Sequence, residues 1–283
     1  MVNTLKPISE KLAVPPFRGT RAKRRGSWRS GGIDVFAMLI GIALLSALCL
    51  ARNSVWQDDF TLWKDAAMKG PYNSRAHSGL GNDYKKRGFI AEAVKEWELA
   101  LSINPYYSPS HSALGVVHLE AGRLHEAEKE LLLALEYGPD YADIHARLGY
   151  IYAKKGYPDR AIEEFSRALR IEPFMEEAKA NLAAVYVEKG YSYGEKKDFV
   201  RAADMFKKAL MVDEGRLAAI YGLAMGYEEL GLKDDALALW REYLERAPSG
   251  DPYAGTARRH VETLERTSPP LYKGRQGGVK IET

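Results

Sequence analysis

The stretch from Ala142 to Pro173 decides the fold, and it reads ADIHARLGYIYAKKGYPDRAIEEFSRALRIEP. Its landmarks recur when the sequence is shifted back once and then twice by about 34 residues. The recurring positions are Leu148-Gly149 with Leu114-Gly115 and Leu80-Gly81; Gly156 with Gly122 and Gly88; Ala161 with Ala127 and Ala93; Ala168 with Ala134 and Ala100; and Pro173 with Pro139 and Pro105. An ordinary bundle of amphipathic helices would not repeat all of these in one register, so the sequence predicts a tandem repeat.

Each repeat is predicted to be a helix, a turn and a second helix. Leu148 and Tyr152 lie four residues apart and therefore share one face of the first helix. Gly149 has no Cβ, and the close approach of the second helix that this allows offsets the ~1 kcal/mol that a helical glycine costs against alanine. Gly156 falls where the first helix should end, in the left-handed conformation of a C-cap. Pro173 breaks the second helix.

The second helix carries Ala161, Phe165 and Ala168, which place small residues on either side of one large ring. With Leu148-Gly149 and Tyr152, this resembles the tetratricopeptide repeat (TPR) family, whose pattern is W-x2-L-G-x2-Y, A-x3-F, P. The resemblance implies an all-α superhelical solenoid over residues 74–250, with about five repeats. It also implies a groove, lined by the first helices, that binds a protein or peptide.

Two later units are irregular. The fourth has Leu182, Tyr186 and Gly190 in register, but its next landmarks, Ala202, Phe206 and Ala209, arrive about seven residues late, or ~1.9 helical turns. We expect residues 191–197 to extend the helical hairpin, with a plain loop insertion as the alternative. The fifth unit has its landmarks at Leu223, Tyr227, Gly231, Ala236, Trp240 and Pro248. A helix over residues 251–266 is expected to cap the solenoid, followed by a disordered tail over residues 267–283.

The N-terminal part differs from the repeats. Residues 1–30 lack periodicity and are expected to form a disordered tail, which is basic through Arg18, Arg21, Lys23, Arg24, Arg25 and Arg29. Residues 33–51 are apolar except for Asp34 and Ser46, and about 20 such residues can span a membrane. The basic residues in front predict an N-terminus inside and repeats outside, in the periplasm if the protein is bacterial. A cleaved signal peptide or a buried helix are the alternatives.

Residues 52–73 are interpreted as a degenerate half-repeat, because Trp63, Ala66 and Pro71 match Phe165, Ala168 and Pro173. This segment and the start of the next unit carry a second resemblance, through Arg52-Asn53, Trp56, Asp58, Asp59, Leu62-Trp63, Pro71, Arg75-Ala76-His77 and Leu80-Gly81. This is similar to the junction between membrane and repeats in multi-span membrane proteins of the O-mannosyltransferase type. Those proteins carry their catalytic acids in loops between spans that this sequence lacks, so the resemblance implies the non-catalytic arm alone.

The composition argues against several classes of function. A net charge of +3 is too small to indicate nucleic-acid binding by the whole chain, and one cysteine excludes an internal disulfide or a multi-cysteine metal site. No catalytic or cofactor motif is found. His77, His111 and His145 share one repeat position, but neighbouring helices lie ~8–10 Å apart. We therefore expect them to pack or to lie at the surface, and not to share a metal ion. Asp58 and Asp59 are interpreted as acids at a helix N-terminus.

What remains is a binding surface. The groove positions of the family map to partner-binding candidates in three successive units: Arg75, Asn82, Lys85 and Lys86; then Leu119; then Tyr150 and Lys154. Lys85 and Lys86 could equally be solvated surface charges. The sequence therefore predicts a membrane-anchored, non-catalytic TPR scaffold that binds a protein or peptide. The alternative is an accessory or truncated TPR arm of a membrane glycosyl-transfer system.

Overall fold

The computed structural model describes residues 31–54 and 58–267. The chain divides into two compact units, Met1–Gln57 and Asp58–Thr283, and each is considered by itself. The described part of the first unit is one helix, α1 (Gly31–Ser54). The disorder expected for residues 1–30 and for the tail after Thr267 lies outside the described residues.

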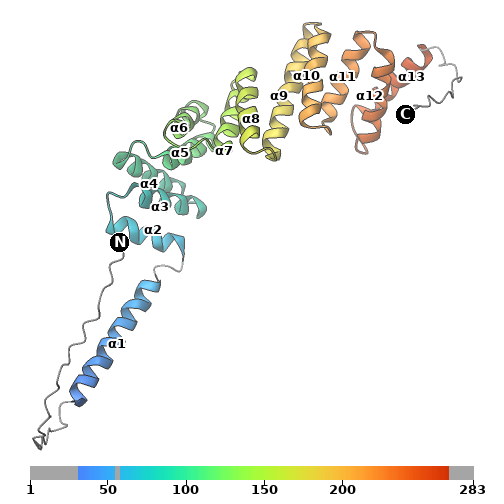
Figure 1. The fold of residues 1–283 in the computed structure, drawn as a ribbon. Helices are drawn as coiled ribbons and strands as arrows, with labels where there is room; N and C mark the ends of the chain where they lie inside the picture. Colours follow the sequence, from blue (N-terminus) through green and yellow to red (C-terminus); the bar gives the residue numbers. More distant parts are fainter. Residues whose placement is uncertain (1–30, 55–57, 268–283) are drawn as a thin grey trace, which may run out of the picture. The chain divides into compact units, whose positions relative to one another are not determined.

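The second unit is a succession of helices, and the described residues contain no strand (Figure 1). The helices are α2 (Asp59–Lys69), α3 (Ser74–Lys86), α4 (Ile90–Ile103), α5 (Ser108–Glu120), α6 (Leu124–Tyr137), α7 (Ala142–Lys154), α8 (Pro158–Ile171), α9 (Glu176–Glu195), α10 (Phe199–Val212), α11 (Leu217–Glu229), α12 (Lys233–Arg246) and α13 (Ala254–Thr267). Each helix packs on the next one in the sequence. Among the first helices, α3 also contacts α5, and α9 contacts both α7 and α11.

The repeated glycine of each first helix makes room for the large side chain of the second helix. A Cβ on Gly149 would lie 2.8 Å from Cδ1 of Phe165, and one on Gly81 would lie 2.6 Å from Nε1 of Trp97. The glycine therefore allows close packing, but the expected close approach of the two backbones is corrected, because the group that it accommodates is a side chain. Gly156 takes the expected turn conformation, with φ at +76°.

The helix α2 acts as the second helix of an incomplete repeat. Trp63 of α2 lies against Gly79, as Phe206 of α10 lies against Gly222 at the same repeat position. Asp58 caps α2, because its carboxylate accepts a hydrogen bond of 2.8 Å from the backbone N–H of Thr61. The interpretation of Asp58 as an acid at a helix N-terminus is confirmed.

The irregular fourth unit extends a helix and does not insert a loop. Helix α9 has 20 residues, whereas α7 has 13. The second helix α10 has 14 residues, as α8 does, so only the first helix of the pair is longer than its neighbours. Gly190, which the repeat register places at the turn, lies inside α9 instead. Lys197 takes the turn position with φ at +59°.

The N-terminal helix departs from expectation. Among the residues that the structure describes, no helix is both long and apolar enough to cross a membrane, so the span expected over residues 33–51 is not supported.

Candidate functional site

Three histidines on successive first helices each pair with a glutamate 19 residues later, on the second helix of the same hairpin. The distances from Nδ1 to the carboxylate oxygen Oε2 are 2.7 Å for His77 and Glu96, 2.7 Å for His111 and Glu130, and 2.6 Å for His145 and Glu164. All three rings are buried. The pairs therefore link the two helices of each hairpin through a polar contact within the packing.

The second ring nitrogen is also occupied. Nε2 of His77 lies 3.2 Å from the carbonyl oxygen of Pro71, and Nε2 of His111 lies 2.9 Å from that of Pro105. Because a carbonyl oxygen only accepts, Nε2 of both rings carries the hydrogen. With both nitrogens engaged, these rings have no free lone pair for a metal ion.

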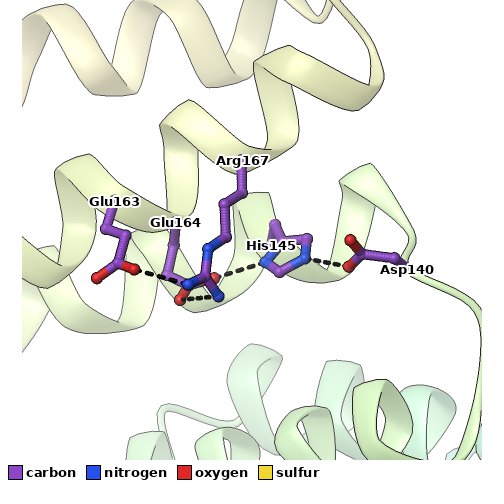
Figure 2. A network of polar contacts seen from close by, with 5 residues as sticks. All are labelled: Asp140, His145, Glu163, Glu164 and Arg167. Carbon is purple, nitrogen blue, oxygen red and sulfur yellow. Dashed lines mark hydrogen bonds and ion pairs between the residues drawn. The ribbon is translucent and has the colours of Figure 1, made fainter.

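The third pair belongs to a larger network (Figure 2). Nε2 of His145 contacts the carboxylate of Asp140, which precedes α7. Nη1 of Arg167 lies 3.6 Å from Oε1 of Glu164, and Nη2 of Arg167 lies 2.7 Å from Oε1 of Glu163. The side chains shown in Figure 2 come from α7, α8 and the connection before them.

The packing interpretation of the histidines is confirmed. Within residues 31–54 and 58–267, no three histidine, cysteine, aspartate or glutamate side chains are grouped so that they could hold a metal ion. Sequence reasoning missed the glutamate partners. The available signal was that Glu96, Glu130 and Glu164 recur with the same period as the histidines.

Three of the partner-binding candidates on the first full unit, Asn82, Lys85 and Lys86, already contact other side chains of the protein. Lys85 forms an ion pair of 2.8 Å with Glu120 of the next unit. The side-chain oxygen of Asn82 accepts a hydrogen bond of 3.1 Å from Nε1 of Trp97. Nζ of Lys86 lies 3.3 Å from Oδ1 of Asp83. The basic character expected at this unit is therefore largely neutralised by neighbouring groups.

The remaining candidates are spread over three helices. Arg75 is exposed on α3, and Leu119 on α5 is half-buried against the core. Tyr150 is 39% exposed on α7, and Nζ of Lys154 lies 5.4 Å from the centre of its ring. Their role in partner binding stays a prediction.

A hollow that sequence reasoning missed lies between α9, α10 and α11, and we call it the C-terminal hollow. It has a volume of about 370 Å³ and is lined by Tyr191, Phe206 and Tyr221, among others. Gly190 and Gly194 on α9, and Gly222 and Gly226 on α11, also line it. The available signals were the extension of the fourth unit and these two glycine pairs, each spaced by four residues.

The comparisons with known proteins agree with this architecture. One family model described as a tetratricopeptide repeat matches residues 112–176, and another with the same description matches residues 183–216. The hairpins within residues 112–176 and 183–216 are thus similar to tetratricopeptide repeats. The described second unit is accordingly an all-helical TPR solenoid. The comparison with curated proteins found no match.

Solved TPR structures resemble the chain in fold. YrrB, described as a TPR protein with an unusual peptide-binding site, is 17% identical, with a TM-score of 0.54 over 71% of this chain and 97% of that chain. MamA is 20% identical, with a TM-score of 0.47 over 61% of this chain and 91% of that chain. A tetratricopeptide repeat protein from Parabacteroides merdae ATCC 43184 is 19% identical, with a TM-score of 0.45 over 70% of this chain and 80% of that chain.

At 17% identity the likeness to YrrB shows the fold alone. The comparisons do not show the resemblance to O-mannosyltransferase-type membrane proteins, which stays a prediction from the junction residues.

Proposed function

We propose that this TPR chain is a non-catalytic scaffold that binds a protein or peptide along the surface formed by its first helices. The observation that carries the proposal is that first helices of successive units contact one another at three places: α3 with α5, α7 with α9, and α9 with α11. Exposed side chains therefore form a shared surface on α3 and α5 and another on α7, α9 and α11. The repeat architecture supports such a surface, because stacked repeats present elongated binding faces.

Two further observations support binding over catalysis. The three histidines that could serve acid–base chemistry are buried, and each is paired with a partly buried glutamate of the same hairpin. In addition, YrrB, which shares the fold, is described as having a peptide-binding site.

The test is affinity capture with the full chain as bait, using charge reversals on matched faces of one hairpin. Arg75→Glu changes an exposed residue on the first helix α3, and Lys95→Glu changes an exposed residue on the second helix α4. A partner recognised by the first-helix surface should be captured by the wild type and by Lys95→Glu, but several-fold less by Arg75→Glu. Equal capture by all three, or no discrete partner at all, would contradict the proposal.

We further propose that the N-terminal segment holds the chain at a membrane, with the N-terminus inside and the repeats outside. The support is the row of exposed apolar side chains on α1, which includes Phe36, Leu45 and Leu50. Carbonate extraction of membranes from cells that make the full chain, or a variant lacking residues 1–57, tests this. The full chain should stay in the membrane pellet and the variant should not. Recovery of the full chain in the supernatant would argue against attachment.

A further inference from the structure

We infer that the C-terminal hollow binds a basic peptide segment, with an apolar side chain seated against Phe206 and a neighbouring lysine or arginine held by Glu195 and Glu229. This inference rests on the proposed binding function and names one site and one ligand chemistry for it.

The hollow exists because of the extension that distinguishes the fourth unit. Tyr191, Gly194 and Glu195, which all line it, belong to the part of α9 that its neighbours lack. Gly190 and Gly222 let the Phe206 ring pack directly against both helices, since a Cβ on Gly190 would lie 2.6 Å from Cε1 of that ring. No protein atom lies within 4 Å of where a Cβ on Gly194 would be. The chain therefore leaves this space open.

The walls of the hollow suit an apolar side chain. Phe206 and Tyr191 pack edge to face with ring centres 5.1 Å apart, and Phe199 and Met225 add apolar surface. The volume of about 370 Å³ is within the usual range for ligand pockets. Tyr191 is 44% exposed, so a bound group would remove its ring from water.

The charges around the hollow favour a cation. Glu195 and Glu229 line it, and no lysine or arginine does among the described residues. Neither carboxylate has an ion-pair partner in the part of the chain that the structure describes, whereas Asp198, close by in the sequence, is paired with Arg201. A positive group is therefore the complementary partner. The faces of Tyr191 and Tyr221 can also attract a cation.

A second hollow makes a peptide the best-fitting occupant. It has a volume of about 460 Å³ and shares Tyr191 and Tyr221 with the first. Tyr243 and Asp251 line it, and the Tyr243 hydroxyl donates a hydrogen bond of 2.8 Å to Asp251. Two adjoining hollows can accept two side chains of one extended segment, which a single small group could not fill.

The test measures binding of short fluorescent peptides to the purified full chain by fluorescence anisotropy. Three matched peptides are used, in which leucine stands beside lysine, leucine beside glutamate, and serine beside lysine. The leucine–lysine peptide should bind at least about tenfold more tightly than either of the others, because each of the others lacks one of the two complementary groups.

Two leucine substitutions on the chain separate the site from general effects. Gly194→Leu places a side chain in the hollow without a clash of its Cβ, and should weaken binding of the leucine–lysine peptide at least about tenfold. Gly255→Leu, on α13, also meets no atom within 4 Å and lies outside the hollow, so it should bind as the wild type does. A second variant carries both Glu195→Gln and Glu229→Gln. It should bind the leucine–lysine peptide more weakly than the wild type does, and its binding should depend less on salt.

Equal binding by the Gly194→Leu and Gly255→Leu proteins, or equal binding of the leucine–lysine and leucine–glutamate peptides, would overturn the inference. If no peptide binds while the chain still captures a protein partner that Arg75→Glu releases, the inference fails and the proposed function stands. If neither peptide binding nor partner capture is found, both fail.

Discussion

Nδ1 of His145 on α7 lies 2.6 Å from Oε2 of Glu164 on α8. In the fifth unit, the same two positions are occupied by Ile220 and Leu239, which belong to one apolar cluster. The solenoid therefore uses either a polar pair or an apolar pair to fill one place between the helices of a hairpin. This substitution within a single chain shows that the hairpin does not need the polar pair.

Replacing both members of the polar pair should cost much less than replacing one. Glu164→Leu alone leaves the 2% exposed His145 without its carboxylate, which should lower the free energy of unfolding by about 1–3 kcal/mol. The double change His145→Ile with Glu164→Leu should recover most of that loss, because it copies the fifth unit. Urea denaturation of the wild type, both single variants and the double variant gives the coupling energy. Simple additivity of the single effects would contradict this interpretation.

Lys197→Gly should stabilise the protein. Lys197 has φ at +59°, and a left-handed conformation costs an L-residue roughly 1–2 kcal/mol that glycine avoids. The other hairpin turns support this, since Gly88, Gly122, Gly156 and Gly231 hold positive φ. The adjacent Lys196 has φ at −81°, so Lys196→Gly is the control and should give no gain. A rise in the thermal midpoint of both variants alike would show that φ is not the cause.

Gly149→Ala should destabilise the third repeat. The new Cβ would lie 2.8 Å from the Phe165 ring, and overpacking of this kind costs roughly 1–3 kcal/mol. Gly194→Ala provides the comparison, because its Cβ meets no atom and alanine favours a helix over glycine by ~1 kcal/mol. Chemical denaturation should therefore show changes of opposite sign. A gain in stability from Gly149→Ala would rule out tight packing at this position.

Glu128 should contribute to stability in a pH-dependent way. Burial acts to raise the pKa of its carboxyl, but hydrogen bonds from Lys155 and Tyr152 outweigh burial, and the net pKa is lowered from 4.5. A lowered pKa stabilises the folded state above pH 4.5 and loses that contribution as the pH falls through the folded-state value. Glu128→Gln should therefore be less stable than the wild type at pH 7, by under about 1 kcal/mol.

The difference in unfolding free energy should shrink as the pH is lowered below 4.5. Glu126→Gln changes an exposed glutamate on the same helix and is the matched control, expected to show little difference at either pH. A deficit for Glu128→Gln that stays constant down to acidic pH would indicate lost packing instead of a lost ion pair.

The repeat units could be predicted because their signals are local and recur. Each landmark residue affects only the few residues around it, as Leu148, Gly149, Gly156 and Pro173 do. Because these landmarks recur with one period, each repeat strengthens the prediction made from the others. The same reasoning reached the longer fourth unit, since about seven residues are close to two helical turns. It misplaced the turn, however, because it took Gly190 as the cap and did not foresee Lys197 in the left-handed conformation.

The sequence by itself thus determined the class of fold and the number of hairpins, whereas the burial of the histidines came from the structure. Only the tertiary structure decided which carboxylate meets each ring, as with His145 and Glu164, because those groups lie on different helices. It also decided that the extension of α9, the glycines of α11 and the ring of Phe206 enclose a hollow. Such a space depends on three helices meeting at fixed distances, and no local pattern in the chain specifies those distances.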